Sequence, residues 1–236
     1  MRSTYRFAVH VCLACLIGLP FLFGCEKRRE RQEAILGEDD SRFVLAIVLD
    51  MSGSFAQLMA EEGKGYEFAM LVIDRYFRDR IGTRDKIVFA QISGADRKLL
   101  WEGTATALRQ EFPSANAFRQ FLMTKADPSR SLVYDGITQS VDYVLSDPGI
   151  SSGKAKSALF VLSDMLDTGT GPNADESKQK AKDALASYGR HGGIVGLYYV
   201  DLNLVREWRQ ILQDAGIQHY SVQSEIVGKP NLPSFE

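Results

Sequence analysis

The sequence predicts an α/β fold in which a doubly wound, mostly parallel six-stranded sheet carries helices on both faces and has one antiparallel edge strand. Short apolar runs alternate along the chain with segments whose apolar residues recur at helical spacing, which favours parallel strands joined by crossover helices. Residues 43–49 form an almost continuous apolar run rich in branched side chains, typical of a strand buried on both faces. Residues 98–102 are short and amphipathic, which suits an antiparallel edge strand.

The remaining elements follow from the same signals along the chain. Ser114 suits the amino-terminal cap of one helix, and Gly82 and Gly189 are expected to end two others. The sequence Asp147-Pro148-Gly149 is expected to stop a fourth helix. The predicted helices lie at residues 66–81, 114–122, 133–145, 181–188 and 204–215. The other strands are expected at residues 86–93, 157–163, 193–200 and 217–222.

Composition and charge narrow the class of protein. The chain has 236 residues, of which 45% are hydrophobic and 25% charged, a balance typical of a folded domain rather than a disordered chain. Its formal net charge is -2, and acidic and basic residues are interspersed. A nucleic-acid-binding protein usually carries a basic patch, and none is visible, so we expect no nucleic-acid partner.

The amino terminus has the pattern of an export signal. Arginines precede an apolar run over residues 7–23, which predicts a signal peptide over residues 1–24. The run ends in Leu-Phe-Gly before Cys25, a stretch that resembles the lipobox of bacterial lipoproteins. The resemblance implies that Cys25 is acylated and becomes the first residue of the mature chain, and an uncleaved amino-terminal anchor is the alternative. Because the other cysteines, Cys12 and Cys15, lie in the signal, no disulfide is expected in the mature fold.

A charged segment at residues 25–42 separates the signal from the folded part. It carries few apolar residues, so we expect a solvated tether between the lipid and a domain at 43–222, followed by a C-terminal tail at 223–236. Lipidation implies a membrane-anchored lipoprotein of the bacterial cell envelope, with its domain outside the cytoplasm. Glu26 stands in place of the aspartate linked to inner-membrane retention, which favours the outer membrane.

Oxygen-bearing side chains follow two of the predicted strands. Asp50, Ser52 and Ser54 come after the first strand, and Asp164 follows the strand at 157–163. Ligands of open α/β sheets bind at the carboxyl ends of the strands, and this topology can place these two strands side by side. Carboxylate and hydroxyl oxygens suit Mg2+, Ca2+ or Mn2+ rather than Zn2+, with Mg2+ expected. On its own, such a turn would more often hold side-chain caps than a metal.

These residues resemble the metal-ion-dependent adhesion site (MIDAS) of the von Willebrand factor type A (VWA) domain family. The family's first motif, D-x-S-x-S after the first strand, is matched by Asp-Met-Ser-Gly-Ser at 50–54. Its last motif, usually Ser/Thr-Asp-Gly, is matched in two of three positions by Ser-Asp-Met at 163–165. Its middle ligand, normally a threonine after glycines, falls at Ser131, which follows Arg130 instead. The resemblance covers about residues 42–222 and implies a VWA fold.

The resemblance also implies a binding mechanism. Serine hydroxyls would be direct ligands of the ion, the two aspartates would act partly through water, and the carboxylate of a protein partner would complete the coordination. We therefore expect a lipid-anchored extracytoplasmic domain that binds a protein partner through a divalent ion, rather than an enzyme. The expected metal site consists of Asp50, Ser52, Ser54, Ser131 and Asp164.

Two alternatives remain open. The same site would suit a metal-dependent phosphohydrolase in which Asp50 and Asp164 surround Mg2+ and Arg130 binds the phosphate. However, no general base stands out in the sequence, and no G-x-S-x-G turn presents a nucleophilic serine. The other alternative is a structural envelope protein whose site binds no ion.

Overall fold

The computed structural model describes residues 42–57, 63–79, 84–92, 98–125, 127–169, 173–224 and 230–234, without the side chains at positions 54, 56, 65, 77 and 79. These residues belong to one compact unit that spans Ser41–Glu236. The signal peptide, Cys25, nearly all of the tether, Gly82 and the hydroxyl of Ser54 lie outside the described part. The predictions made for them are therefore not examined by the structure.

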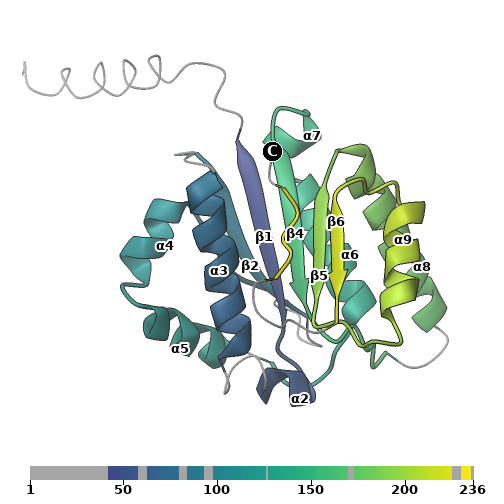
Figure 1. Ribbon diagram of the computed structural model, residues 1–236, viewed down its shortest axis with the longest axis horizontal. Coiled ribbons are helices and arrows are strands. Elements are labelled where there is room, and N and C mark those ends of the chain that lie inside the picture. The colour runs from purple at the N-terminus through teal and green to yellow at the C-terminus, as the bar shows by residue number, and fades with distance from the viewer. Residues whose placement is uncertain are drawn as a thin grey trace, which may run out of the picture. The chain divides into compact units, whose positions relative to one another are not determined.

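A six-stranded sheet forms the centre of the described residues (Figure 1). Its spatial order is β3-β2-β1-β4-β5-β6. Neighbouring strands are parallel except that β3 runs antiparallel to β2 at one edge. This confirms the predicted fold class, including its antiparallel edge strand. The strands are β1 (Phe43–Asp50), β2 (Lys86–Ile92), β3 (Leu99–Gly103), β4 (Lys156–Leu162), β5 (Ile194–Tyr198) and β6 (Tyr220–Gln223).

The helices connect these strands, and the longer ones follow the apolar spacing seen in the sequence. The Ser114 hydroxyl accepts a hydrogen bond from the Ala117 amide at 3.2 Å, which confirms the predicted cap. No helix within the described ranges is long and apolar enough to cross a bilayer. The helices are α2 (Gly53–Ala56), α3 (Lys64–Asp79), α4 (Ala105–Glu111), α5 (Ala115–Lys125), α6 (Val133–Leu145), α7 (Pro148–Ser151), α8 (Ala174–Arg190) and α9 (Val205–Asp214).

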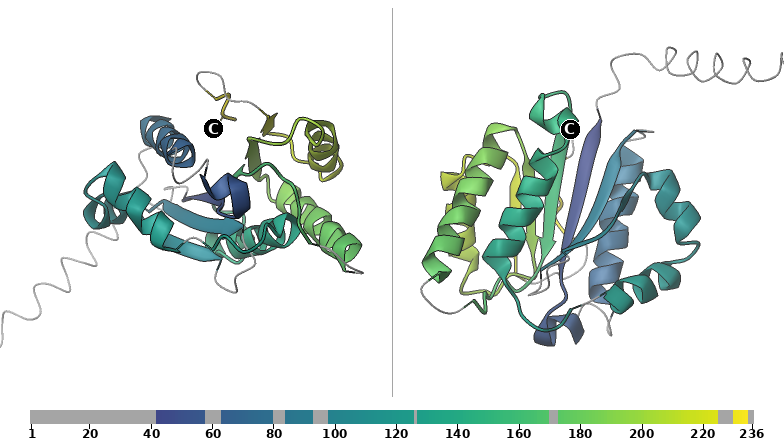
Figure 2. Two further views of the ribbon diagram at one scale, coloured as in Figure 1. Left: turned by 90° about the horizontal axis from the view of Figure 1, so that it is seen from below. Right: turned by 180° about the vertical axis from the view of Figure 1, so that it is seen from behind.

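Helices cover both faces of the sheet (Figure 2). Apolar side chains of the central strand β1 pack on both faces. Val44, Ala46 and Val48 belong to the apolar cluster that includes the buried faces of α6, α8 and α9. Leu45 and Ile47 point to the opposite cluster, which includes the buried faces of α3, α4 and α5. Because successive strand residues alternate between faces, burial on both sides explains why the run in β1 is apolar throughout.

Three short helices, α2, α4 and α7, were not predicted. Helix α4 carries a single buried residue, Leu108, so it shows no apolar stripe, and Thr104 caps it by accepting a hydrogen bond from the Ala107 amide at 3.2 Å. Helix α7 begins where the sequence predicts only a stop. The carboxylate of Asp147 accepts from the Gly149 amide at 2.9 Å, and Pro148 occupies the first turn, so this stretch both follows the end of α6 and starts α7.

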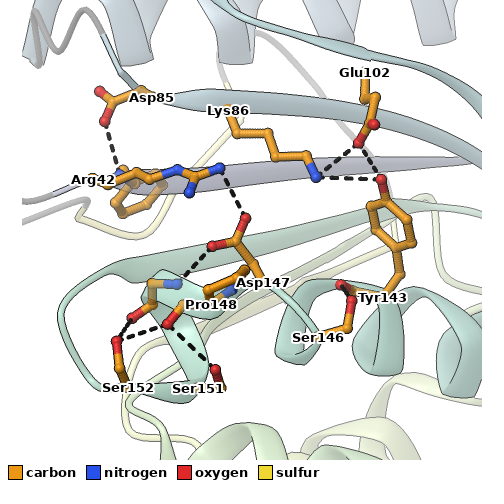
Figure 3. A network of polar contacts seen from close by, with 12 residues as sticks. Arg42, Asp85, Lys86, Glu102, Tyr143, Ser146, Asp147, Pro148, Ser151 and Ser152 are labelled. Carbon is orange, nitrogen blue, oxygen red and sulfur yellow. Dashed lines mark hydrogen bonds and ion pairs between the residues drawn. The ribbon is translucent and has the colours of Figure 1, made fainter.

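Ion pairs close the amino-terminal end of the sheet (Figure 3). Arg42 lies 3.0 Å from the buried carboxylate of Asp147, which joins the start of β1 to the α6–α7 turn. Lys86 at the start of β2 lies 2.7 Å from Glu102 of β3, and the Tyr143 hydroxyl of α6 donates to the same carboxylate. The hydrogen bonds from Lys86 and Tyr143 lower the pKa of Glu102. At the amino-terminal end of the sheet, these charged side chains are therefore paired with one another.

Candidate metal centre

Asp50, the last residue of β1, lies at the centre of the candidate site. Its side chain is buried, with 1% of the residue exposed. One carboxylate oxygen accepts from the Ser52 hydroxyl at 2.5 Å and from the Ser52 amide at 3.0 Å. The other accepts from the hydroxyls of Ser131 at 2.9 Å and Ser163 at 2.8 Å. The Asp50 carboxylate therefore accepts hydrogen bonds from three serine hydroxyls that lie on three different loops.

The first loop turns sharply after β1. The bond from the Ser52 amide to the Asp50 side chain makes a side-chain turn that reverses the chain at once. Gly53 follows with φ +47, a conformation that favours glycine, and opens α2. Its amide donates to the Pro128 carbonyl at 3.3 Å, which holds this loop against the one that carries Ser131.

Ser131 is positioned by the loop that follows β4. The Ser131 amide donates to the Thr168 hydroxyl at 3.1 Å, and the Thr168 amide donates to the Ser131 carbonyl at 2.8 Å. Next to it, Asp167 accepts from the Tyr134 amide at 3.1 Å in the first turn of α6, where a negative charge also stabilises the helix terminus. Ser131 is 5% exposed, and the bonds of its amide and carbonyl to Thr168 fix its main chain while its hydroxyl donates to Asp50.

Asp164 contributes a second carboxylate at the end of β4. One of its oxygens accepts from the Leu166 amide at 2.9 Å, and its carbonyl accepts from the Asp201 amide at 2.8 Å. Burial raises the pKa of Asp164, and the nearby charges of Asp50 and Asp201 raise it further. Within the described residues neither Asp50 nor Asp164 forms an ion pair. A positive ion would relieve this concentration of negative charge.

Ser163 is the member of the site that the sequence did not single out. It is fully buried, and its hydroxyl donates to Asp50 while accepting from the Met165 amide at 2.9 Å. The signal was its place directly before Asp164 in the triplet at 163–165. Because the hydroxyl uses both functions at once, it fixes the turn after β4 relative to β1.

Replacing Ser163 by alanine is expected to lower the free energy of unfolding by about 1–3 kcal/mol, because Asp50 loses a buried donor and the Met165 amide loses its acceptor. Urea denaturation measures the change. Ser140→Ala is the matched control, since Ser140 is also buried but only donates within α6 to the Gly136 carbonyl. Equal losses in the two variants would contradict this role of Ser163.

Backbone strain is concentrated at the same edge of the sheet. Among the described residues, Met165 and Tyr199 are the non-glycine residues with positive φ, at +63 and +67. Tyr199 directly follows β5 and Met165 lies three residues after β4, where the resembling motif carries glycine. Such positions cost about 1–3 kcal/mol each and are found mainly at functional sites. The strain is consistent with a turn shape that is retained although the glycine is not.

The oxygen donors fit a hard divalent cation. When the Ser52 and Ser131 hydroxyls donate their protons to Asp50, their lone pairs remain for a metal ion, and the hydrogen bond makes them better ligands. Within the described ranges, no group of three or more His, Cys, Asp or Glu side chains lies close enough together to hold a metal ion. The candidate set therefore combines two carboxylates with hydroxyls, which suits Mg2+, Ca2+ or Mn2+.

A cavity of about 510 Å3 opens beside these hydroxyls. Ser52 and Ser131 are among the residues that line it, together with Arg130, Asp135 and Thr168. Arg130 is exposed, and within the part of the chain that the structure describes it forms no ion pair. The cavity thus joins the serine hydroxyls to a surface that offers a free positive charge.

The structure brings Asp50, Ser52 and Ser131 into direct contact and places Asp164 close enough for the charge of Asp50 to affect it. The carboxylate of Asp164 itself is bonded within its own turn. The hydroxyl of Ser54 is not described. That these residues hold a metal stays a prediction.

Comparison with solved structures identifies the fold. The chain is similar to the SpRpn10 VWA domain, with a TM-score of 0.52 and 10% identity over 83% of this chain and 90% of that one. It is also similar to the pilus adhesin SpaC from Lactobacillus rhamnosus GG in an open conformation, with a TM-score of 0.53 and 13% identity over 79% of this chain and 28% of the adhesin. No protein-family model and no curated protein sequence matches it. The predicted VWA-type fold is confirmed.

Proposed function

We propose that this VWA-type domain binds a protein partner through a divalent metal ion at the carboxyl ends of β1 and β4. The observation that carries the proposal is the buried Asp50 carboxylate, which accepts three serine hydroxyls and has no positive partner within the described residues. A buried charge is costly unless it is compensated. A cation beside the hydroxyls would compensate it and would explain why they converge there.

The proposed ion is Mg2+, and Ca2+ or Mn2+ would use the same ligands. Ser52, Ser54 and Ser131 would bind it through their hydroxyls, while Asp50 and Asp164 would supply the negative charge, in part through water. When bound, the ion offers a site for a carboxylate of the partner. Ser163 orients Asp50 rather than binding the ion, because its oxygen already accepts from the Met165 amide.

The cavity beside the site gives the partner access. Ser52 and Ser131 reach its wall, so a glutamate or aspartate entering from this side would meet the proposed ion directly. Arg130, which also lines the cavity, would attract a second acidic group.

The domain is proposed to act at the cell envelope. The lipobox-like stretch before Cys25 would give a lipid anchor, and the charged tether up to residue 42 would hold the domain away from the membrane, outside the cytoplasm. Glu26 after the lipidated cysteine favours the outer membrane. The similarity to a pilus adhesin concerns the fold, and an envelope-bound binding module is in keeping with it.

A magnesium titration of thermal stability tests the metal site. We expect the melting temperature of the chain from Cys25 onward to rise with Mg2+, by the equivalent of about 2.7 kcal/mol at 100 times the dissociation constant. Asp164→Asn is expected to weaken the response at least tenfold in Mg2+ concentration, because it removes a charge next to the ion. Asp142→Asn, which changes an exposed aspartate on α6, is the control and keeps the full response.

The same variants separate binding from catalysis. With Mg2+ present, we expect no turnover of generic phosphate esters by the wild-type domain. Robust hydrolysis that is lost in Asp164→Asn and kept in Asp142→Asn would replace the binding proposal with the phosphohydrolase. A wild-type melting temperature that does not respond to Mg2+, Ca2+ or Mn2+ would refute the metal site.

A further inference from the structure

We propose that Leu166 and Leu202 form, together with the metal site, a docking surface for an extended protein segment in which an acidic residue stands next to apolar side chains. The inference rests on the proposed function, since the acidic residue would bind the ion. It adds the apolar half of the recognition. The apolar contacts would come from the loops after β4 and β5, in which Asp164 is the only proposed metal ligand.

Both leucines are unusually exposed for large apolar side chains. Leu166 is 49% exposed and Leu202 is 76% exposed, and Met123 at 43% is the other exposed large apolar residue within the described ranges. Met123 lies on α5, whereas the two leucines follow the adjacent parallel strands β4 and β5. A pair of exposed apolar side chains beside a polar site is a feature of interaction surfaces.

The two leucines are held by matching turns. The Leu166 amide donates to the carboxylate of Asp164, and the Asn203 amide donates to the carboxylate of Asp201, both at 2.9 Å. Each turn is thus closed by the aspartate that begins it. The Asp201 amide also donates to the Asp164 carbonyl at 2.8 Å, which joins the two turns. Apolar side chains on such fixed loops lose little freedom when a partner covers them.

The loops beneath the leucines are also anchored in the core. Met165, next to Leu166, is buried to 2% exposure and has positive φ. Tyr199 has positive φ as well, and its ring lies 6.0 Å from the ring of Phe55 and 6.2 Å from that of Phe68 between centroids. Phe55 belongs to α2, directly after Ser52 and Gly53. The contact between Tyr199 and Phe55 therefore links the loop that carries Leu202 to the loop that carries Ser52.

Charge determines which segment fits this surface. Asp50, Asp164 and Asp201 make the site negative, and the last two lie at the base of the leucine turns. An acidic segment would be repelled unless an ion is bound, and a basic one would be attracted without it. Only a segment that offers a carboxylate to the ion and apolar groups to the leucines uses both features. Covering each leucine is expected to strengthen binding about tenfold.

A selection experiment tests the inference. A random peptide library is displayed and selected on the chain from Cys25 onward in Mg2+, and the enriched peptides are synthesised. We expect Asp or Glu with Leu, Ile, Phe or Met within about three positions. Affinity should fall at least tenfold in the double variant Leu166→Ser and Leu202→Ser, and binding should disappear in EDTA. Met123→Ser is the control and should bind as the wild type does, because it changes an exposed large apolar residue on α5.

The outcomes separate the two proposals. Enrichment of acidic residues alone, with affinities unchanged in the double leucine variant, would overturn the docking surface and leave the metal site standing. Peptides that bind equally well in EDTA, or the absence of acidic enrichment, would refute the metal-dependent function and the docking surface with it. Because both leucines are exposed, the melting temperature of the double variant should match the wild type, which shows that a loss of binding is local.

Discussion

Replacing Asp50 by alanine is expected to abolish the response of the melting temperature to Mg2+ and to lower the metal-free free energy of unfolding by about 3 kcal/mol. The first effect follows because the hydroxyls of Ser52 and Ser131 would lose the carboxylate that orients them. The second follows because three buried hydroxyls, including that of Ser163, would lose their acceptor, while removal of the uncompensated buried charge of Asp50 offsets part of this loss. Urea denaturation with and without Mg2+ measures both.

Asp85→Ala provides a control for the loss of a buried aspartate. Asp85 is 2% exposed and accepts from the Phe43 amide at 2.8 Å, at the opposite end of β1. This variant is expected to lose stability but to keep the full rise in melting temperature with Mg2+. If Asp50→Ala keeps the same magnesium response as Asp85→Ala, Asp50 is not part of a metal site.

The sequence alone predicted the turn that carries Asp50 and Ser52, but it did not predict the long-range contacts that hold Ser131 in place. Asp50 and Ser52 follow one buried strand, so their turn is a local property that the residues themselves indicate. Ser131 bonds to Asp50 across 81 positions, and it was found through a family resemblance rather than through spacing. The bonds between Ser131 and Thr168 could not be predicted from the sequence, because one is a main-chain bond that any residue could form and the other joins the Ser131 amide to a threonine hydroxyl 37 positions away.

The fold followed from hydrophobic periodicity wherever an element buries a face. β1 is buried throughout and was predicted almost to its bounds, and α6 was predicted at its observed limits, because six of its residues are buried at helical spacing. Helix α4 was missed because it has one buried residue, and the signal that remained was the Thr104 cap at its start. Elements that are stabilised by caps rather than by burial therefore escape this kind of prediction.

Trp208 links α9 to the part of the fold that positions Ser131. It is 1% exposed, and its ring stacks on that of Tyr134 in α6 with centroids 5.7 Å apart and an interplanar angle of 29°. The Tyr134 amide is the group that Asp167 caps. Beside this contact, Lys178 of α8 forms an ion pair with Glu207 at 2.5 Å. Helices α6, α8 and α9 thus meet around one aromatic pair behind the site.

Replacing Trp208 by alanine is expected to lower the free energy of unfolding by about 3–5 kcal/mol, since α9 buries only two other residues, Ile211 and Leu212, and the lost ring leaves a cavity against Tyr134. Urea denaturation followed by circular dichroism measures the loss. Trp208→Phe keeps an aromatic ring in the same place and should cost clearly less, about 1–2 kcal/mol. A loss below about 1 kcal/mol in Trp208→Ala would show that the buried ring contributes little to the stability of the fold and would contradict this role of Trp208.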